Sequence, residues 1–238
     1  MIACFDSGNS RIKWGLHDGW QWLARGAVAH AEVGQLARLA ADWPMPDRVV
    51  LANVAGVAAA QRIRAALPAW SPLFEEIQAT AQAGGVINHY RFPEKLGVDR
   101  WCALIGARGL VASAAVVVMA GTATTIDTLD AAGNFLGGLI LPGNELMRRS
   151  LASDTAGLPF AEGRHADYPR CTDDAIVTGA IEAQVGAIER AWRRLRDPAA
   201  ICLLSGGNGP LLRPFLEIPC REVPNLPLEG LLRIAGPT

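Results

Sequence analysis

The 238-residue sequence lacks several features that mark whole classes of protein. Its five cysteines include no C-x-x-C pair, which argues against a disulfide framework or a thiolate zinc site and favours a reducing compartment. The first six residues carry no basic segment and already include Asp6, unlike a signal peptide. The longest apolar run, around residues 110–120, contains Ser113 and is shorter than the roughly 20 residues that span a bilayer. We therefore expect a soluble cytoplasmic protein that does not associate with membranes.

The charge also lacks an excess of either sign. A net charge of −1 provides no global attraction for nucleic acid, although a local basic patch is not excluded. Lysine is scarce, with two residues against twenty arginines. By contrast, half of the residues are hydrophobic, which is enough to bury a sizeable core and excludes a disordered or fibrous chain. We expect a globular protein with a small-molecule substrate rather than a nucleic-acid partner.

Two segments of the chain follow the same plan. Residues 2–16 and residues 115–129 each read as an apolar strand, a tight turn rich in small polar residues and a second strand, which predicts a β-hairpin. Each hairpin opens one half of the chain. The pair therefore predicts a duplicated α/β fold of two subdomains, residues 1–110 and 111–238, with a site in a cleft between them.

The rest of the pattern alternates between helices and strands, as in the α/β class. Thr172, Asp173 and Asp174 form a start signal for the longest predicted helix. We expect helices at residues 32–41, 57–67, 97–110, 145–151 and 172–196, and further strands at 48–53, 135–141 and 200–204.

The turn of the first hairpin has the residues that a phosphate-binding loop needs. Gly8 lets the backbone approach phosphates, Asp6 can hold Mg²⁺ or its waters, and Lys13 can neutralise phosphate charge. Asp, Gly, Asn and Ser are also the ordinary residues of any hairpin turn. The turn alone leaves both readings open.

A second turn of the same kind, residues 121–125, favours the functional reading, because two such loops can hold one polyphosphate. Threonine is also an ordinary strand residue, so this signal has a structural alternative. A third glycine cluster, residues 205–209, follows a buried strand and suits either the adenosine end of a nucleotide or a plain turn.

Asp99 and Arg100 stand at the start of a predicted helix between the two hairpins. Asp99 can accept a proton from a substrate hydroxyl, and Arg100 can bind a substrate carboxylate through two hydrogen bonds. Alternatively, an acid in the first turn stabilises the helix dipole and the arginine lies on the surface.

Taken together, these motifs resemble the type III pantothenate kinase family, including its branch named Bvg accessory factor. The resemblance rests on four motifs that occur in order along most of the chain: residues 6–13, 97–100, 121–125 and 137–143. It implies a duplicated actin/Hsp70/sugar-kinase-like (ribonuclease H-like) fold. It also implies ATP-dependent phosphorylation of pantothenate to 4′-phosphopantothenate, the first step of coenzyme A biosynthesis.

The resemblance also implies a role for each matching residue. Asp99 would be the proton acceptor for the pantothenate hydroxyl. The residues implied to bind ATP are Asp6 (near Mg²⁺), Ser7, Gly8, Asn9, Ser10, Arg11, Ile12, Lys13 and Thr122. Those implied to bind pantothenate are Tyr90, Gly97, Val98, Asp99, Arg100 and Thr172, the last from across a homodimer interface.

At one position the sequence departs from the family pattern. Met119 occupies the place of an aspartate that ligates a monovalent cation, K⁺ or NH₄⁺, and a thioether cannot replace that hard ligand. Backbone carbonyls would have to hold the ion, or the protein would use it weakly or not at all. This departure also leaves open an alternative function, a regulatory protein on the same fold with weak or lost kinase activity.

Overall fold

The computed structural model describes residues 1–236, which form a mixed α/β protein of two compact units. Unit 1 contains residues 1–112, residues 133–135 and the chain from Asn225 onward. Unit 2 contains residues 113–132 and 136–224. The segment from Asn225 onward therefore belongs to the same unit as residues 1–112. The sequence pattern predicts instead a single boundary near residue 110.

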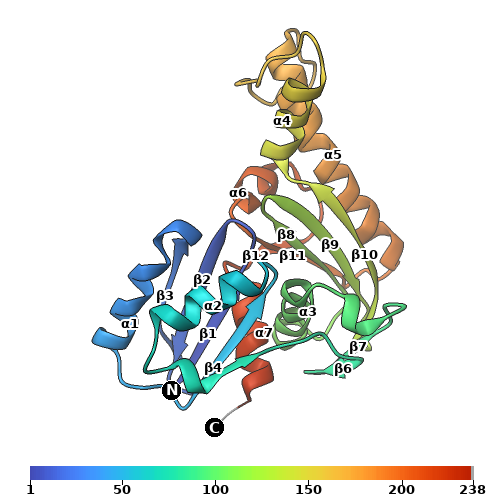
Figure 1. The fold of residues 1–238 in the computed structure, drawn as a ribbon. Coiled ribbons are helices and arrows are strands. Elements are labelled where there is room, and N and C mark those ends of the chain that lie inside the picture. The colour runs from blue at the N-terminus through green and yellow to red at the C-terminus, as the bar shows by residue number, and fades with distance from the viewer. Residues whose placement is uncertain (237–238) are drawn as a thin grey trace. The chain divides into compact units, whose positions relative to one another are not determined.

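Unit 1 is built on a five-stranded sheet in the order β3-β2-β1-β4-β5 (Figure 1). Strand β2 is antiparallel to β1 and β3, while β4 is parallel to β1 and β5. Every residue of the central strand β1 is buried, as expected where both faces of a sheet are covered. The strands are β1 (Ile2–Ser7), β2 (Arg11–His17), β3 (Trp22–Ala29), β4 (Arg48–Asn53) and β5 (Phe74–Glu76).

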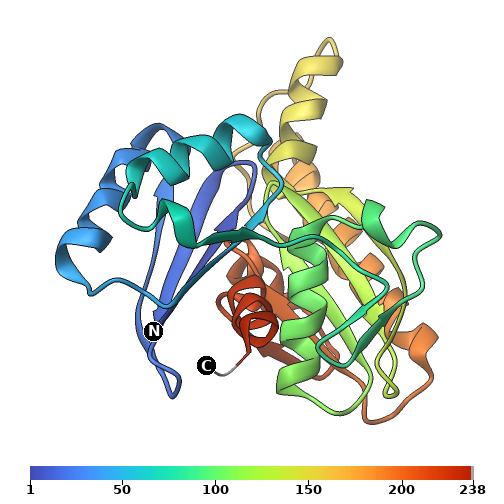
Figure 2. The same cartoon turned by 60° about the horizontal axis from the view of Figure 1, so that its bottom comes forward.

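Helices cover both faces of this sheet. Alternate residues of β1 explain this, because Ala3 and Phe5 belong to one core cluster, and Ile2 and Cys4 to the other. The first cluster packs on 3₁₀-helix η1 (His30–Leu36), α1 (Ala37–Asp42) and α2 (Val57–Ala66). The second packs on α3 (Val98–Leu110) and α7 (Leu226–Ala235), which lie side by side in Figure 2.

Short elements connect the sheet of unit 1 to α3. They are 3₁₀-helices η2 (Ser71–Leu73) and η3 (Pro93–Lys95) and strands β6 (Gln82–Ala83) and β7 (Val86–Asn88). Strand β7 pairs with the first two residues of β10 (Asn134–Pro142), which also belong to unit 1.

Unit 2 repeats the strand order of unit 1. Its strands follow the order β10-β9-β8-β11-β12, with β9 antiparallel to β8, and β11 parallel to β8 and β12. Strands β10, β9, β8, β11 and β12 thus occupy the places that β3, β2, β1, β4 and β5 have in unit 1. This correspondence confirms the predicted duplication. The new strands are β8 (Ala115–Ala120), β9 (Ala123–Leu129), β11 (Ile201–Ser205) and β12 (Cys220–Glu222).

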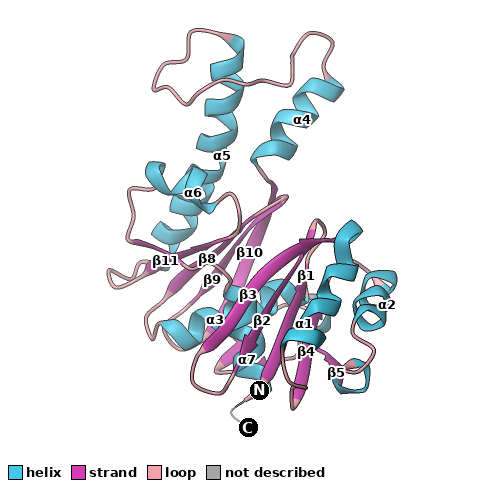
Figure 3. Cartoon of the chain, turned by 90° about the vertical axis from the view of Figure 1, so that its left-hand side faces the viewer, coloured by secondary structure: helices cyan, strands magenta, loops and turns pink. Residues whose placement is uncertain are grey.

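The helices of unit 2 include two long neighbours. Helix α4 (Asn144–Asp154) and helix α5 (Thr172–Leu195) lie side by side and extend beyond the sheet of their unit (Figure 3). The inner half of α5 packs Ile181, Val185 and Ile188 against Val116 and Val118 of β8. Helix α6 (Gly209–Leu212) and 3₁₀-helix η4 (Arg213–Phe215) complete the unit.

The predicted hairpins, strands and helices are confirmed to within a few residues, with one exception. The helix expected at residues 32–41 is α-helical only in α1, because the preceding residues form the 3₁₀-helix η1, in which Glu32 departs from helical geometry. At α5, Thr172 is the first helical residue and Cys171 is the N-cap. The carboxylates of Asp173 and Asp174 accept hydrogen bonds from the backbone N–H groups of Glu162 and Arg164, so the start signal also fixes the preceding loop. Within residues 1–236, no helix is both long and apolar enough to cross a membrane.

Candidate functional site

The β1–β2 hairpin places Asp6 directly across from Lys13. The Lys13 ammonium lies 4.0 Å from Asp6 Oδ2. The Gly8 N–H donates to the Arg11 carbonyl and closes the turn, while the His30 ring approaches the Gly8 carbonyl to 2.7 Å. Residues 9–11 at the tip are exposed. The hairpin thus combines a buried acid, an adjacent cation and an accessible turn held from one side by a histidine.

The carboxylate of Asp6 is in an unusual environment. Asp6 is 5% exposed and Ser7 is fully buried, yet Asp6 Oδ1 and Ser7 Oγ have no hydrogen-bond partner among residues 1–236. Burial raises the pKa of Asp6 to about 6, with the Lys13 charge opposing this shift and the Asp99 charge adding to it. Because Asp6 and Ser7 are successive residues of β1, these two oxygens lie on opposite faces of the sheet. On the face of Asp6, a water, an ion or a ligand can complete the hydrogen bonding of Oδ1.

The start of α3 positions Asp99. The Trp101 N–H donates to the Gly97 carbonyl in the first turn. A Cβ atom on Gly97 would lie 2.7 Å from Asp99 Oδ1, so the glycine leaves room for this carboxylate. Burial raises the pKa of the Cys102 thiol, and the charges of Asp6 and Asp99 raise it further. The charges of Asp6 and Asp99, 93 positions apart in the sequence, therefore both influence Cys102, and the two carboxylates lie in the same region of unit 1.

Arg100 and Tyr90 form the neighbouring part of unit 1. Arg100 is 5% exposed, and its guanidinium lies 5.8 Å from the centre of the Tyr90 ring and 5.9 Å from that of Phe135. Asn88 fixes this segment, because its side chain accepts from the Tyr90 N–H and donates to the carbonyls of Thr80 and Pro93. Arg100 is thus a buried cation packed on aromatic faces, not a surface arginine.

In unit 2, three glycine-containing turns meet. The Gly143 N–H donates to the Thr122 carbonyl, and the Asn208 side chain donates to the Gly121 carbonyl. A Cβ atom on Gly143 would lie 2.1 Å from the Gly121 carbonyl oxygen, and one on Gly206 would lie 2.3 Å from the Ala120 carbonyl oxygen. Only glycine permits these approaches, so the second predicted loop and the third glycine cluster form one backbone-lined surface.

The remaining predicted residues also lie in unit 2. Thr122 is exposed at the tip of the β8–β9 turn. Met119 is half-buried in β8, where Thr125 and Ser205 are its partners on the adjacent strands. Thr172 is exposed at the first turn of α5.

The donors at each candidate ion position can be compared with what the ion requires. Asp6 offers a hard carboxylate oxygen, Oδ1, that has no partner within residues 1–236, as Mg²⁺ or its waters require. Met119 offers a thioether, which does not suit K⁺. The described part of the chain contains no group of three or more His, Cys, Asp or Glu residues arranged to hold a metal.

Comparison with known proteins decides the family. The profile of the type III pantothenate kinase family matches residues 2–194. A type III pantothenate kinase from Dechloromonas aromatica is 66% identical over 235 residues, which cover 99% of both chains. The chain belongs to the type III pantothenate kinase family.

Solved structures confirm the predicted fold class of this pantothenate kinase family member. A Campylobacter jejuni protein assigned to the Baf family of transcriptional activators has a TM-score of 0.67 at 19% identity, over 98% of this chain and 96% of the other. A Sinorhizobium meliloti protein assigned as a 2-dehydro-3-deoxygalactonokinase has a TM-score of 0.59 at 14% identity, over 97% of each chain. At these identities the likeness concerns the fold alone, that of actin-like sugar kinases and ATPases.

Three residues that hold the candidate site segments were given no such role from the sequence of this family member. They are His30, which contacts the first loop, Asn88, which holds Tyr90, and Asn208, which holds the second loop. The glycine cluster around Asn208 was a signal for its segment. No local pattern distinguishes His30 or Asn88, because their partners are brought to them by the tertiary fold.

Proposed function

We propose that this protein transfers the γ-phosphoryl group of ATP to the primary hydroxyl of pantothenate and forms 4′-phosphopantothenate, the first step of coenzyme A biosynthesis. The observation that carries this proposal is full-length identity of 66% to a type III pantothenate kinase. The two carboxylates Asp6 and Asp99 in unit 1, with Lys13 beside Asp6, support it chemically. Phosphoryl transfer requires mainly positioning and charge neutralisation from the protein.

On the nucleotide side, residues 6–13 bind the phosphates. The loop contributes Ser7, Gly8, Asn9, Ser10, Arg11, Ile12 and Lys13 in addition to Asp6. The carboxylate of Asp6, whose Oδ1 has no partner among the described residues, is the position at which Mg²⁺ or its waters would be held. Bound Mg²⁺ would neutralise phosphate charge. Lys13, whose side chain is 26% exposed, would supply a further positive charge to the phosphates.

Unit 2 would contribute the second part of the nucleotide site. Thr122 is exposed at the turn of β8 and β9, and we infer that it contacts ATP there. The hydrogen bonds from Gly143 and Asn208 to this turn hold its backbone in one conformation. A preorganised turn loses little conformational entropy when the nucleotide binds.

On the acceptor side, Asp99 orients the pantothenate hydroxyl and receives its proton. An alcohol is far too weak an acid to be fully deprotonated by a carboxylate, so the proton moves late, once the γ-phosphoryl group has largely left ADP. Gly97 and Val98 line the same site, and Gly97 leaves the space that Asp99 occupies.

Arg100 and Tyr90 bind the remainder of pantothenate. Arg100 is a buried positive charge beside the Tyr90 ring, and pantothenate carries a carboxylate that such a guanidinium can pair with. Asn88 positions Tyr90 through the hydrogen bond from the Tyr90 N–H.

We propose that the enzyme depends only weakly on K⁺ or NH₄⁺. The position of the expected ligand is taken by Met119, and a thioether provides little affinity for these ions. Any ion at this site would have to be held by backbone carbonyls.

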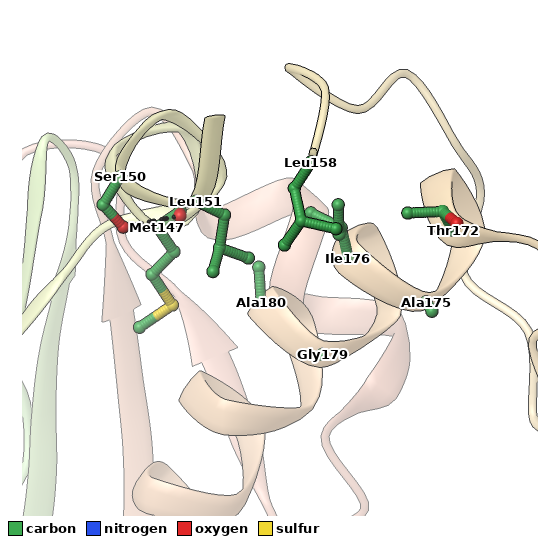
Figure 4. Close-up of a pocket in the computed structure, with 9 residues that line it drawn as sticks. All are labelled: Met147, Ser150, Leu151, Leu158, Thr172, Ala175, Ile176, Gly179 and Ala180. Carbon is green, nitrogen blue, oxygen red and sulfur yellow. Dashed lines mark hydrogen bonds between the residues drawn. The ribbon is translucent and has the colours of Figure 1, made fainter. Parts of the chain in front are cut away.

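We also propose that the protein is a homodimer that acts in the cytoplasm. A groove of about 540 Å³ runs between α4 and α5 in unit 2, and its lining is mostly apolar (Figure 4). Thr172 lies on its edge, and the exposed residues Leu151, Ala175 and Gly179 line it. A second copy packed on these helices would cover the groove and place Thr172 at the interface, from which it would reach the pantothenate site of the partner.

The proposal is tested by a coupled assay of ADP release with and without pantothenate, with mass spectrometry of the product. Release that requires pantothenate and yields the 4′-phosphate supports it. Equal release without pantothenate, or phosphorylation of another alcohol only, contradicts it. Repeating the assay with K⁺, NH₄⁺ and Na⁺ tests the ion proposal, which predicts rates within about threefold of one another.

A further inference from the structure

Two cysteines of unit 2 that have no role in the proposed reaction are direct neighbours. Cys202 in β11 and Cys220 in β12 are register partners on parallel strands. Such partners point to the same face of a sheet, and adjacent strands lie about 4.8 Å apart. A disulfide needs Cα atoms about 4.4–6.8 Å apart, so the strand spacing suits a bond between the two residues.

The two thiols also interact. Hydrogen bonding between the two thiols lowers the pKa of Cys220. The positive charge of Arg213 in η4 lowers this pKa further, while partial burial and the charge of Glu222 raise it. The same hydrogen bond, with burial, raises the pKa of Cys202 because it holds the proton on that sulfur. Cys220 is therefore the better nucleophile of the pair.

Cys220 is also the more solvent-accessible of the two cysteines. Cys220 is half-buried on the edge strand of the sheet, while Cys202 is 0% exposed. A small oxidant thus reaches Cys220 first, and Cys202 is its buried neighbour on the adjacent strand. The other cysteines lack this arrangement. Cys4 and Cys102 are both fully buried, which raises the pKa of each thiol. Cys171 is exposed at the N-cap of α5 and is not on either strand of the pair.

We propose that Cys220 and Cys202 form a reversible oxidation site in which hydrogen peroxide converts the two thiols into a disulfide. The Cys220 thiolate attacks one peroxide oxygen, the O–O bond breaks, and the products are Cys220 sulfenic acid and hydroxide, which takes up a proton. The Cys202 sulfur, on losing its proton, then attacks the Cys220 sulfur. The S–O bond breaks, water leaves and the S–S bond forms. The two thiols lose two electrons and peroxide is reduced to two waters.

The test uses the full chain carrying Cys171→Ser, which removes the exposed thiol and avoids disulfides between molecules. The folded protein is treated with peroxide, its remaining thiols are alkylated, and it is digested without reductant. We expect two of the four thiols to be lost, peptides containing Cys202 and Cys220 to be linked, and dithiothreitol to restore both. Adding Cys202→Ala should stop the reaction at a Cys220 sulfenic acid that dimedone traps.

The control is Cys220→Ser in the same background, which should retain all of its remaining thiols. A Cys220 sulfinic acid with Cys202 still a free thiol would overturn the proposal. So would an unreacted pair under conditions that oxidise Cys171 in the unsubstituted chain. The readout is thiol chemistry alone, so its outcome is independent of the kinase assay.

Discussion

At the residue scale, the central question is whether Asp99 is a catalytic group or only an acid in the first turn of a helix. Both roles place a carboxylate near a helix N-terminus. The surroundings differ, because Asp99 shares its part of unit 1 with the buried Asp6, whereas Glu145 in the first turn of α4 is an exposed acid paired with Arg149. The two acids therefore form a matched pair for experiment.

We predict that Asp99→Asn lowers kcat at least about 100-fold and leaves the binding of ATP within a few-fold, since general-base catalysis contributes about 10² to 10⁴. Glu145→Gln removes an equivalent helix-start charge and should leave kcat within about twofold. Steady-state kinetics and nucleotide titration measure both effects. Similar activity in the two variants would mean that Asp99 serves its helix alone.

The environment of Asp6 predicts a pH effect on stability. Its pKa is about 6 in the folded chain against an ordinary value of 3.8, so between these pH values the folded state holds more protons than the unfolded state. The contribution of Asp6 to stability is therefore greatest at low pH and is lost as the pH rises through about 6.

We expect Asp6→Asn to remove this part of the pH dependence in protein free of Mg²⁺ and nucleotide. Between pH 4 and pH 6, the Tm of the variant should fall less, or rise more, than that of the unsubstituted chain. Asp42→Asn, at an exposed position of α1, serves as the control and should keep the original slope. If the Tm of all three proteins changed with pH in the same way, burial would not raise the pKa of Asp6. The Asp6 variant should also lose most of its kinase activity.

At the scale of elements, the packing of α3 on α7 holds the substrate-side helix in place. A Cβ atom on Gly230 would lie 1.8 Å from the Cys102 carbonyl oxygen, and one on Gly106 would lie 2.4 Å from that of Leu226. The two helices approach so closely that backbone meets backbone. Because Asp99 and Arg100 start α3, this contact sets the position of the candidate acceptor site.

Gly230→Ala should destabilise the protein by about 2 kcal/mol or more, because backbone atoms cannot yield to an added methyl group as a flexible side chain can. Gly186→Ala, in an open position on α5, should instead stabilise it by about 0.5–1 kcal/mol through helix propensity. Urea denaturation followed by circular dichroism measures both values. Equal effects would contradict the close approach of α3 and α7.

At the scale of the whole molecule, unit 1 is assembled from segments that are far apart in the sequence. Helix α7 packs against α3 and contacts β1, so it belongs to the unit that residues 1–112 form. In the proposed dimer, a second copy of the chain covers the apolar groove between α4 and α5. Exposed apolar surface of this kind is typical of an interaction site.

We predict that Ala175→Glu, which places a charge in the groove, converts the dimer to a monomer and raises the KM for pantothenate at least about tenfold. Ala58→Glu introduces the same charge on an exposed position of α2 and should change neither property. Sedimentation equilibrium and steady-state kinetics provide the measurements. A monomeric unsubstituted protein with full activity would refute the dimer proposal.

Much of the local structure was predictable because its causes are local. The alternation of apolar residues and the tight turns define both hairpins, and the repeated plan of residues 2–16 and 115–129 predicted the duplication that the strand order confirms. The four motifs in order also led to the family. Short strands such as β5 and β12, of three residues each, have too few positions for a pattern to show.

Which residues lie together was decided by the tertiary structure. The Asp6 and Asp99 charges act on each other across 93 sequence positions, Asn208 holds a loop that starts at Gly121, and Cys202 meets Cys220 across a strand pair. No local pattern encodes these neighbours, because they arise from sheet order and helix packing. The sequence by itself determined both hairpins, most of the longer helices, the residue types of the loops and the family. The partners, burial and charge state of each group followed only from the fold, because each depends on residues that the chain supplies from elsewhere.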